Sequence, residues 1–151
     1  QFVVHPQFLK EYNNRWFLFC AKGGKILNLA LDRMQEINVL DGEIYEDKNI
    51  NPDNFFREVI GVTVSERQRG RNIIFFVDKL NAPYVKTKPF HNSQVVVEEK
   101  EGGTVFKICV QINYELERLL LGFGDSLRVI QPEHLRQRLI QKFNKALKHY
   151  K

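Results

Sequence analysis

Residues 16–21 are apolar at every position, and this run limits the possible folds more than any other part of the sequence. A strand that is apolar on both sides of its pleat must be covered on both faces, as in a small closed barrel. Strand-like runs surround it, so we expect residues 1–48 to be rich in β-structure. The expected strands cover residues 2–9, 15–21, 25–32 and 34–40, with turns at Asn13-Asn14, Gly23-Gly24 and Asp41-Gly42. A short helix should follow and end near Gly61, because Asn51 is a favourable N-cap and Pro52 a favourable first residue. The stretch from residue 62 to about Ser65 is then expected to be a crossing strand, with residues 66–72 as its exposed end.

The second half of the chain has a different pattern, in which strands and helices alternate. The expected order is strand, helix, strand, strand, helix, strand over residues 73–78, 81–87, 94–100, 105–112, 114–121 and 127–130. This β-α-β-β-α-β order is the ferredoxin-like arrangement. Pro132 then opens a last helix, whose apolar residues recur at helical spacing. The chain is therefore predicted to be an α+β protein, a small barrel followed by a ferredoxin-like unit with a C-terminal helix.

The formal net charge of +5 comes entirely from the C-terminal segment. Residues 132–151 hold six basic residues against Glu133 alone, whereas the remaining 17 basic residues are balanced by 17 acidic ones. A basic stripe of this kind can attract the phosphates of a nucleic acid. It is equally typical of a solvated helix face on which lysines maintain solubility.

The sequence contains none of the common catalytic motifs, such as GxSxG, HExxH, a P-loop or GxGxxG after a strand. Its four histidines lie on separate expected elements without ligand spacing. Cys20 and Cys109 lie far apart in apolar runs, as buried free thiols of a reducing cytoplasm do. No apolar run approaches the roughly 20 residues of a membrane-spanning helix. We therefore expect a protein that is not an enzyme, binds no metal, needs no cofactor and does not enter a membrane.

Several residues suited to anion binding are expected to lie near one another in the first half. His5 lies on the first strand and Tyr12 at its end, Arg15 and Trp16 begin the second strand, and Arg33 lies at a later bend. Guanidinium groups bind phosphate or carboxylate, and aromatic rings stack on bases. Other interpretations stay open: Trp16 in the core, Arg33 paired with Asp32 or another acid, and Arg15 as an exposed hairpin charge.

The same segments resemble the WYL domain of bacterial transcriptional regulators. The matching pieces are His5-Pro6-x-x-Leu9, Arg15-Trp16-Phe17-Leu18 and Leu29-Ala30-Leu31-Asp32-Arg33-Met34. The second half resembles the C-terminal extension that accompanies this domain. Its matching pieces are His91-x-Ser93-Gln94, the turn from Glu117 to Gly124, and the segment from Val129 to Arg136. The resemblance covers nearly the whole chain, and the order and spacing of these pieces make it specific.

This resemblance implies a WYL-type SH3/Sm-like barrel with a short helix over residues 1–65 and a ferredoxin-like extension over residues 66–151. It implies a cytoplasmic homodimer that contacts promoter DNA through a helix-turn-helix upstream of this chain. The pocket of such domains is thought to sense an anionic effector, in some members single-stranded nucleic acid or a nucleotide. By position, the ligand-binding residues would be Arg15, Trp16, Phe17, Arg33, His5 and Tyr12. Phe17 lacks a usual tyrosine hydroxyl and Ala30 replaces a frequent arginine, which points to a smaller or less charged ligand.

The predicted function is therefore an effector-sensing and dimerisation region of a transcriptional regulator. An anionic ligand would control DNA binding only if it favoured one arrangement of the two protomers over the other. One alternative is a structural dimerisation module without a ligand, in which the arginines form ion pairs. Another is direct binding of duplex DNA by the basic C-terminal helix, which would weaken steeply with salt.

Overall fold

A computed structural model describes residues 3–42 and 44–150 of the chain. It divides into two compact units, residues 1–57 and residues 58–151. This division lies somewhat before residue 65, where the sequence predicted a domain boundary, and the boundary itself stays a prediction. The two units are described separately below.

The first unit contains one antiparallel sheet with the strand order β1-β2-β3. Its elements are β1 (His5–Tyr12), β2 (Arg15–Lys22), β3 (Lys25–Ala30), the 3₁₀ helix η1 (Leu31–Arg33) and α1 (Pro52–Phe55). The two hairpin turns lie where predicted, and their central residues Asn13, Asn14, Gly23 and Gly24 all have positive φ. The predicted N-cap is confirmed, since the side chain of Asn51 accepts a hydrogen bond from the Asn54 N–H. The helix is only one turn long, however, and does not reach Gly61.

Four phenylalanines form the aromatic core of this unit. Phe8 of β1 stacks on Phe19 of β2 at a centroid distance of 5.0 Å, and Phe55 and Phe56 meet both rings edge-on. The short helix α1 and its C-cap residue Phe56 therefore place two rings against one face of the sheet. Phe19 and the two residues after it, Cys20 and Ala21, are all buried, which confirms that this part of β2 is covered on both faces.

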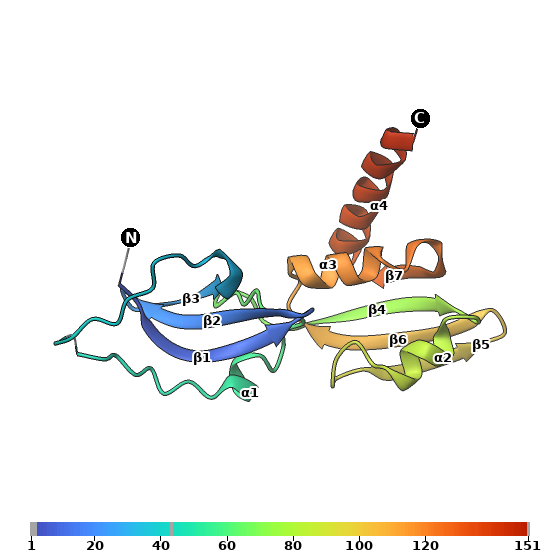
Figure 1. Ribbon diagram of the computed structural model, residues 1–151. Coiled ribbons are helices and arrows are strands. Elements are labelled where there is room, and N and C mark those ends of the chain that lie inside the picture. Colours follow the sequence, from blue (N-terminus) through green and yellow to red (C-terminus); the bar gives the residue numbers. More distant parts are fainter. Residues whose placement is uncertain (1–2, 43, 151) are drawn as a thin grey trace. The chain divides into compact units, whose positions relative to one another are not determined.

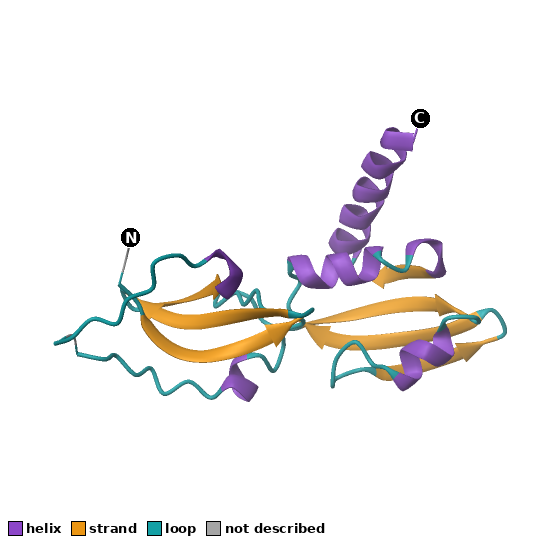
Figure 2. Cartoon of the chain, in the orientation of Figure 1, coloured by secondary structure: helices purple, strands orange, loops and turns teal. Residues whose placement is uncertain are grey.

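The predicted strand over residues 34–40 is wrong. Within the described residues, no strand lies between η1 and α1, and Figure 2 shows this stretch as loop. Ile37 and Val39 alternate as in a strand, but their side chains are 74% and 91% exposed. Alternation alone does not make a strand, because backbone N–H and C=O groups need a pairing partner. The later part of the loop is held instead by the side chain of Gln7, which bonds the backbone of residues 46 and 48.

The second unit contains a four-stranded antiparallel sheet with the order β5-β6-β4-β7 (Figure 1). Its elements are β4 (Arg71–Asp78), α2 (Ala82–Thr87), β5 (Val95–Lys100), β6 (Gly103–Val110), α3 (Tyr114–Leu121), η2 (Gly124–Ser126), β7 (Leu127–Gln131), α4 (Glu133–Leu147) and η3 (Lys148–Tyr150). Strands and long helices follow one another in the predicted order. The chain is thus an α+β protein with two antiparallel sheets and a C-terminal helix.

One face of this sheet supports the core of the second unit. Alternate residues of β4, Ile73, Phe75 and Val77, are fully buried on that face. Phe75 stacks on Phe106 of β6 at 5.6 Å and on Phe90 at 5.4 Å. The helices complete the core with Ala82 and Val85 from α2, Leu116 and Leu120 from α3, and Leu135 and Leu139 from α4. Only the first half of α4 is buried in this way, since Phe143 and Leu147 further along are 41% and 52% exposed.

Candidate functional site

Three arginines alternate along the segment that leads into β4. Arg67, Arg69 and Arg71 are all exposed, and only Arg71 belongs to the strand. The strand predicted to end near residue 65 does not form, so Arg67 and Arg69 lie on a segment without regular secondary structure. Such a segment has few backbone hydrogen bonds of its own, and its conformation depends on what side chains bind to it.

Gln111 fixes the conformation of this segment. Its buried carboxamide accepts a hydrogen bond from the Ser65 N–H at 2.9 Å and donates to the Ser65 and Gln68 carbonyls at 3.1 and 3.0 Å. A further bond runs from the Gly70 N–H to a carboxylate oxygen of Glu58 at 2.7 Å. The arginine-bearing segment is therefore held at both ends by side chains.

The residues just before this segment are fastened to the start of α3. Glu115 accepts hydrogen bonds from the Val62 N–H, the Thr63 N–H and the Thr63 hydroxyl. Asn113, the N-cap of α3, donates to the Ile60 and Thr63 carbonyls. Gly61 makes this close approach possible, because a Cβ there would lie 2.5 Å from the Glu115 Cγ and its φ is +86°.

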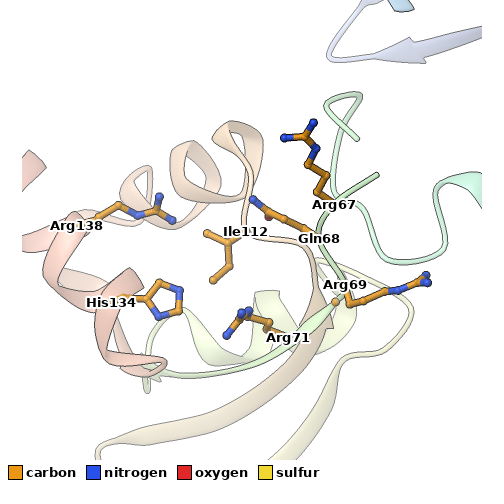
Figure 3. Close-up of a pocket in the computed structure, with 8 residues that line it drawn as sticks. Arg67, Gln68, Arg69, Arg71, Ile112, His134 and Arg138 are labelled. Atoms are coloured by element: carbon orange, nitrogen blue, oxygen red, sulfur yellow. The ribbon is translucent and has the colours of Figure 1, made fainter. Parts of the chain in front are cut away.

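The arginine segment borders a pocket of about 740 Å³ within the second unit. We call this the arginine pocket; its lining residues are Arg67, Gln68, Arg69, Gly70, Arg71, Ile112, His134 and Arg138. Figure 3 shows Arg138 and His134 of α4 and Arg71 of β4 extending toward the space beside Ile112, whereas Arg69 points away from it. The polar groups that line the pocket are thus mainly hydrogen-bond donors, and its apolar side chain is Ile112.

The charges of the arginine pocket are only partly neutralised. Within residues 3–42 and 44–150, no carboxylate forms an ion pair with Arg67, Arg69 or Arg71. Arg138 differs, because its Nη2 lies 2.9 Å from Oε1 of Glu117 on α3. Arg71, which has no counter-ion, and Arg138, which shares its charge with Glu117, both extend toward the cavity, and such guanidinium groups suit an anion with several negative oxygens.

The predicted ligand-binding residues lie in the first unit, and most of them meet at one end of its sheet. Tyr12 pairs with Arg15 in the ladder, and Arg15 forms an ion pair with Asp32 of η1 at 2.9 Å. Arg33 is exposed and has no carboxylate partner among the described residues, so the alternative of an ion pair with Asp32 or another acid is not observed. Trp16 is 51% exposed, which rules out the interpretation of this ring as core.

These predicted residues do not all converge. Side chains alternate along β2, so Arg15 and Phe17 extend from one face of the sheet and Trp16 from the other. His5 pairs with Ala21 at the opposite end of the ladder, roughly 20 Å from Arg15 at about 3.3 Å per residue. There its Nδ1 accepts a hydrogen bond from the backbone N–H of residue 46. His5 is therefore separated from the other predicted residues.

The arginine pocket was not predicted from the sequence. Arg67, Arg69 and Arg71 were expected on the exposed end of a strand, without a partner element. The alternation Arg-x-Arg-x-Arg was the available signal, since three like charges at this spacing lie close together and need a compensating anion or solvent. His134 and Arg138 come from more than 60 residues further along the chain, and no local pattern connects them to the arginine segment.

Two other kinds of site are absent from the part of the chain that the structure describes. No group of three or more His, Cys, Asp or Glu side chains is arranged to hold a metal ion. No helix among these residues has the length and apolar character needed to cross a bilayer.

Comparison with known proteins identifies the family. No curated protein matches the chain. Among solved structures, the chain is similar to proteasome accessory factor B/C (PafBC) of Arthrobacter aurescens, with 17% identity and a TM-score of 0.45. That match covers 97% of this chain but only 22% of the other, a likeness too distant to support an inference about function. The WCX domain family matches residues 62–147, which include the whole arginine pocket. The chain therefore belongs to the WCX domain family, the C-terminal domain associated with WYL domains, which confirms the resemblance to WYL-domain transcriptional regulators.

Proposed function

We propose that this chain is the effector-sensing and dimerisation region of a bacterial transcriptional regulator. It binds an anionic ligand, a nucleotide or a single-stranded nucleic acid, and so controls promoter binding by an upstream helix-turn-helix. In this proposal the protein is a cytoplasmic homodimer without catalytic activity. Membership of the WCX family supports the regulatory role. Residues 1–65 then correspond to a SH3/Sm-like barrel, and residues 66–151 to a ferredoxin-like domain, supported by the strand order β5-β6-β4-β7.

The observation that most directly supports ligand binding is the arginine pocket. Its guanidinium groups lie on two separate segments, residues 67–71 and α4, and Arg67, Arg69 and Arg71 have no carboxylate partner among the described residues. No Phe, Tyr or Trp is among the lining residues, so the pocket has no large stacking platform for a base. It is therefore suited to the phosphate groups of the ligand, and a base would have to be bound elsewhere.

The predicted residues of the first unit remain a second candidate contact. Arg33 is exposed and free of a described carboxylate, whereas Arg15 is occupied by Asp32. Arg33 is thus the better of the two for binding an anion; Phe17 and Tyr12 lie on the same face of the ladder as Arg15, and Trp16 lies on the other face. We assign His5 no direct contact in this proposal, because it lies at the far end of the sheet.

The test is a fluorescence anisotropy titration with short labelled single-stranded and duplex oligonucleotides, with tripolyphosphate as the competitor. Arg71→Gln should weaken binding about tenfold, since a charge-assisted hydrogen bond contributes roughly 1.5 kcal/mol. Arg118→Gln is the matched control, because Arg118 is exposed and outside the pocket. Arg33→Ala tests the first unit in the same way. Equal affinity in all four proteins would refute anion binding at both places.

Two other functions are less well supported. Direct duplex binding by α4 requires free cations, but Arg136 pairs with Glu133, and Arg138 and Lys142 both pair with Glu117, which leaves Lys145 as the unpaired cation among the described residues of this helix. Lys151, counted in the predicted basic stripe, lies outside the described residues. A dimerisation module without a ligand is favoured by the exposed apolar side chains of α4, and would be indicated if no anion bound.

A further inference from the structure

We infer that Glu117 competes with the ligand for Arg138, and so sets the affinity of the arginine pocket for phosphate groups. The inference rests on the proposed function, because it concerns ligand binding at the same pocket. It adds a residue that does not line the pocket but determines how much positive charge the pocket can offer.

Glu117 is a nearly buried carboxylate that is shared by two cations. Its side chain on α3 is 9% exposed. Oε1 lies 2.9 Å from Nη2 of Arg138, and Oε2 lies 2.9 Å from Nζ of Lys142. Both cations belong to α4 and lie about one helical turn apart. The two pairs thus join α3 to α4 through one carboxylate.

Arg138 is the member of this group that a ligand can reach. It lines the arginine pocket, its side chain is 47% exposed, and Figure 3 shows it extending toward Gln68 and Ile112. The same guanidinium therefore faces both a cavity bordered by other arginines and an internal carboxylate. A phosphate that enters the cavity has to share Arg138 with Glu117 or take it over.

The second cation, Lys142, lowers the free-energy cost of this exchange of partners. Removing the only partner of a buried carboxylate is strongly destabilising, because an uncompensated charge is left in a poorly solvated place. Here Lys142 stays on Oε2 when Arg138 turns to a ligand, so Glu117 keeps a counter-ion. The arrangement allows Arg138 to change partners while α3 and α4 remain connected.

The affinity of the pocket should therefore rise when Glu117 loses its charge. Arg138 is about half exposed, and ion pairs with a member open to solvent contribute up to roughly 1 kcal/mol, so Glu117→Gln should tighten the binding of tripolyphosphate about two- to fivefold. A general gain in positive charge would also tighten binding. Glu133→Gln is the matched control, because it changes the net charge equally and precedes the pocket residue His134, but pairs only with Arg136 and Gln137.

We would titrate tripolyphosphate and a short single-stranded oligonucleotide into the wild type and both variants by calorimetry. The inference predicts that Glu117→Gln binds both ligands more tightly than Glu133→Gln does. It also predicts that Glu117→Gln has no effect in an Arg138→Gln background, because the contested group is then absent. Equal affinities for the two Glu→Gln variants would overturn it.

A second pair of variants keeps the inference testable if Glu117→Gln folds poorly. Lys142→Met leaves Glu117 with Arg138 alone, so it should weaken binding more than Lys145→Met, which removes the same charge from the same helix. Equal weakening would contradict the competition. Failure of the proposed function would look different, since the wild type would then bind neither ligand or would bind as well without Arg71.

Discussion

Replacing Gln111 by Ala removes the three hydrogen bonds that hold Ser65 and Gln68 in place. Each is worth about 1 kcal/mol net, and water can reach part of this segment, so the free energy of unfolding should fall by roughly 2–3 kcal/mol. For a unit of this size, that corresponds to a decrease in Tm of roughly 10–20 °C. The change should also weaken anion binding about three- to tenfold. Without Gln111 the arginine segment is ordered only when the anion binds, and the entropy lost in that ordering reduces the binding free energy.

The measurement combines calorimetric unfolding with the anisotropy titration on the same samples. Gln141→Ala, an exposed change on α4, should leave both Tm and affinity unchanged. Arg71→Gln should reduce affinity without a comparable loss of stability, since its side chain forms no ion pair with a described carboxylate. A folded Gln111→Ala protein with unchanged affinity, or a decrease in Tm of less than about 5 °C, would show that the segment is held by something else.

Two further predictions concern the second sheet and the cysteines. Gly103→Ala should destabilise the protein by at least about 3 kcal/mol in urea unfolding, because its Cβ would lie 2.1 Å from the Val77 carbonyl oxygen at a φ of +152°. Gly102→Ala, where a Cβ meets open space, should cost far less, and equal losses would contradict the steric cause. Burial raises the pKa of the Cys20 thiol, so iodoacetamide should modify the half-buried Cys109 first at neutral pH, as peptide mass spectrometry would show. Faster modification of Cys20 would contradict its burial.

Local signals predicted most of the second unit. The glycines at residues 102–103 marked the β5–β6 hairpin, the leucine spacing marked α3, and Pro132 marked the start of α4. In the first unit the turns at residues 13–14 and 23–24 were equally clear. The predicted strand over residues 34–40 does not form, because its alternating apolar residues have no neighbouring strand to pair with, and only the tertiary structure reveals that absence.

The candidate site was less predictable than the fold. The sequence placed Arg15, Trp16 and Arg33 near one another, but it did not show that Asp32 occupies Arg15 or that Trp16 extends from the other face. The arginine pocket depends on Gln111, whose role is to bind backbone groups of a distant loop. Contacts of this kind leave no periodic pattern, so they could not be derived from sequence spacing.

The unpaired guanidinium groups of the arginine pocket also affect the protein when no effector is present. Side chains of Gln111 and Glu58 hold the segment bearing Arg67, Arg69 and Arg71 in one conformation, so these three positive charges are in place before an anion binds. An anion that binds the folded state there stabilises it by an amount that grows with the logarithm of the anion concentration once this exceeds Kd. The Tm of this domain then depends on which anions surround it and at what concentration, including those of the buffer in which it is purified.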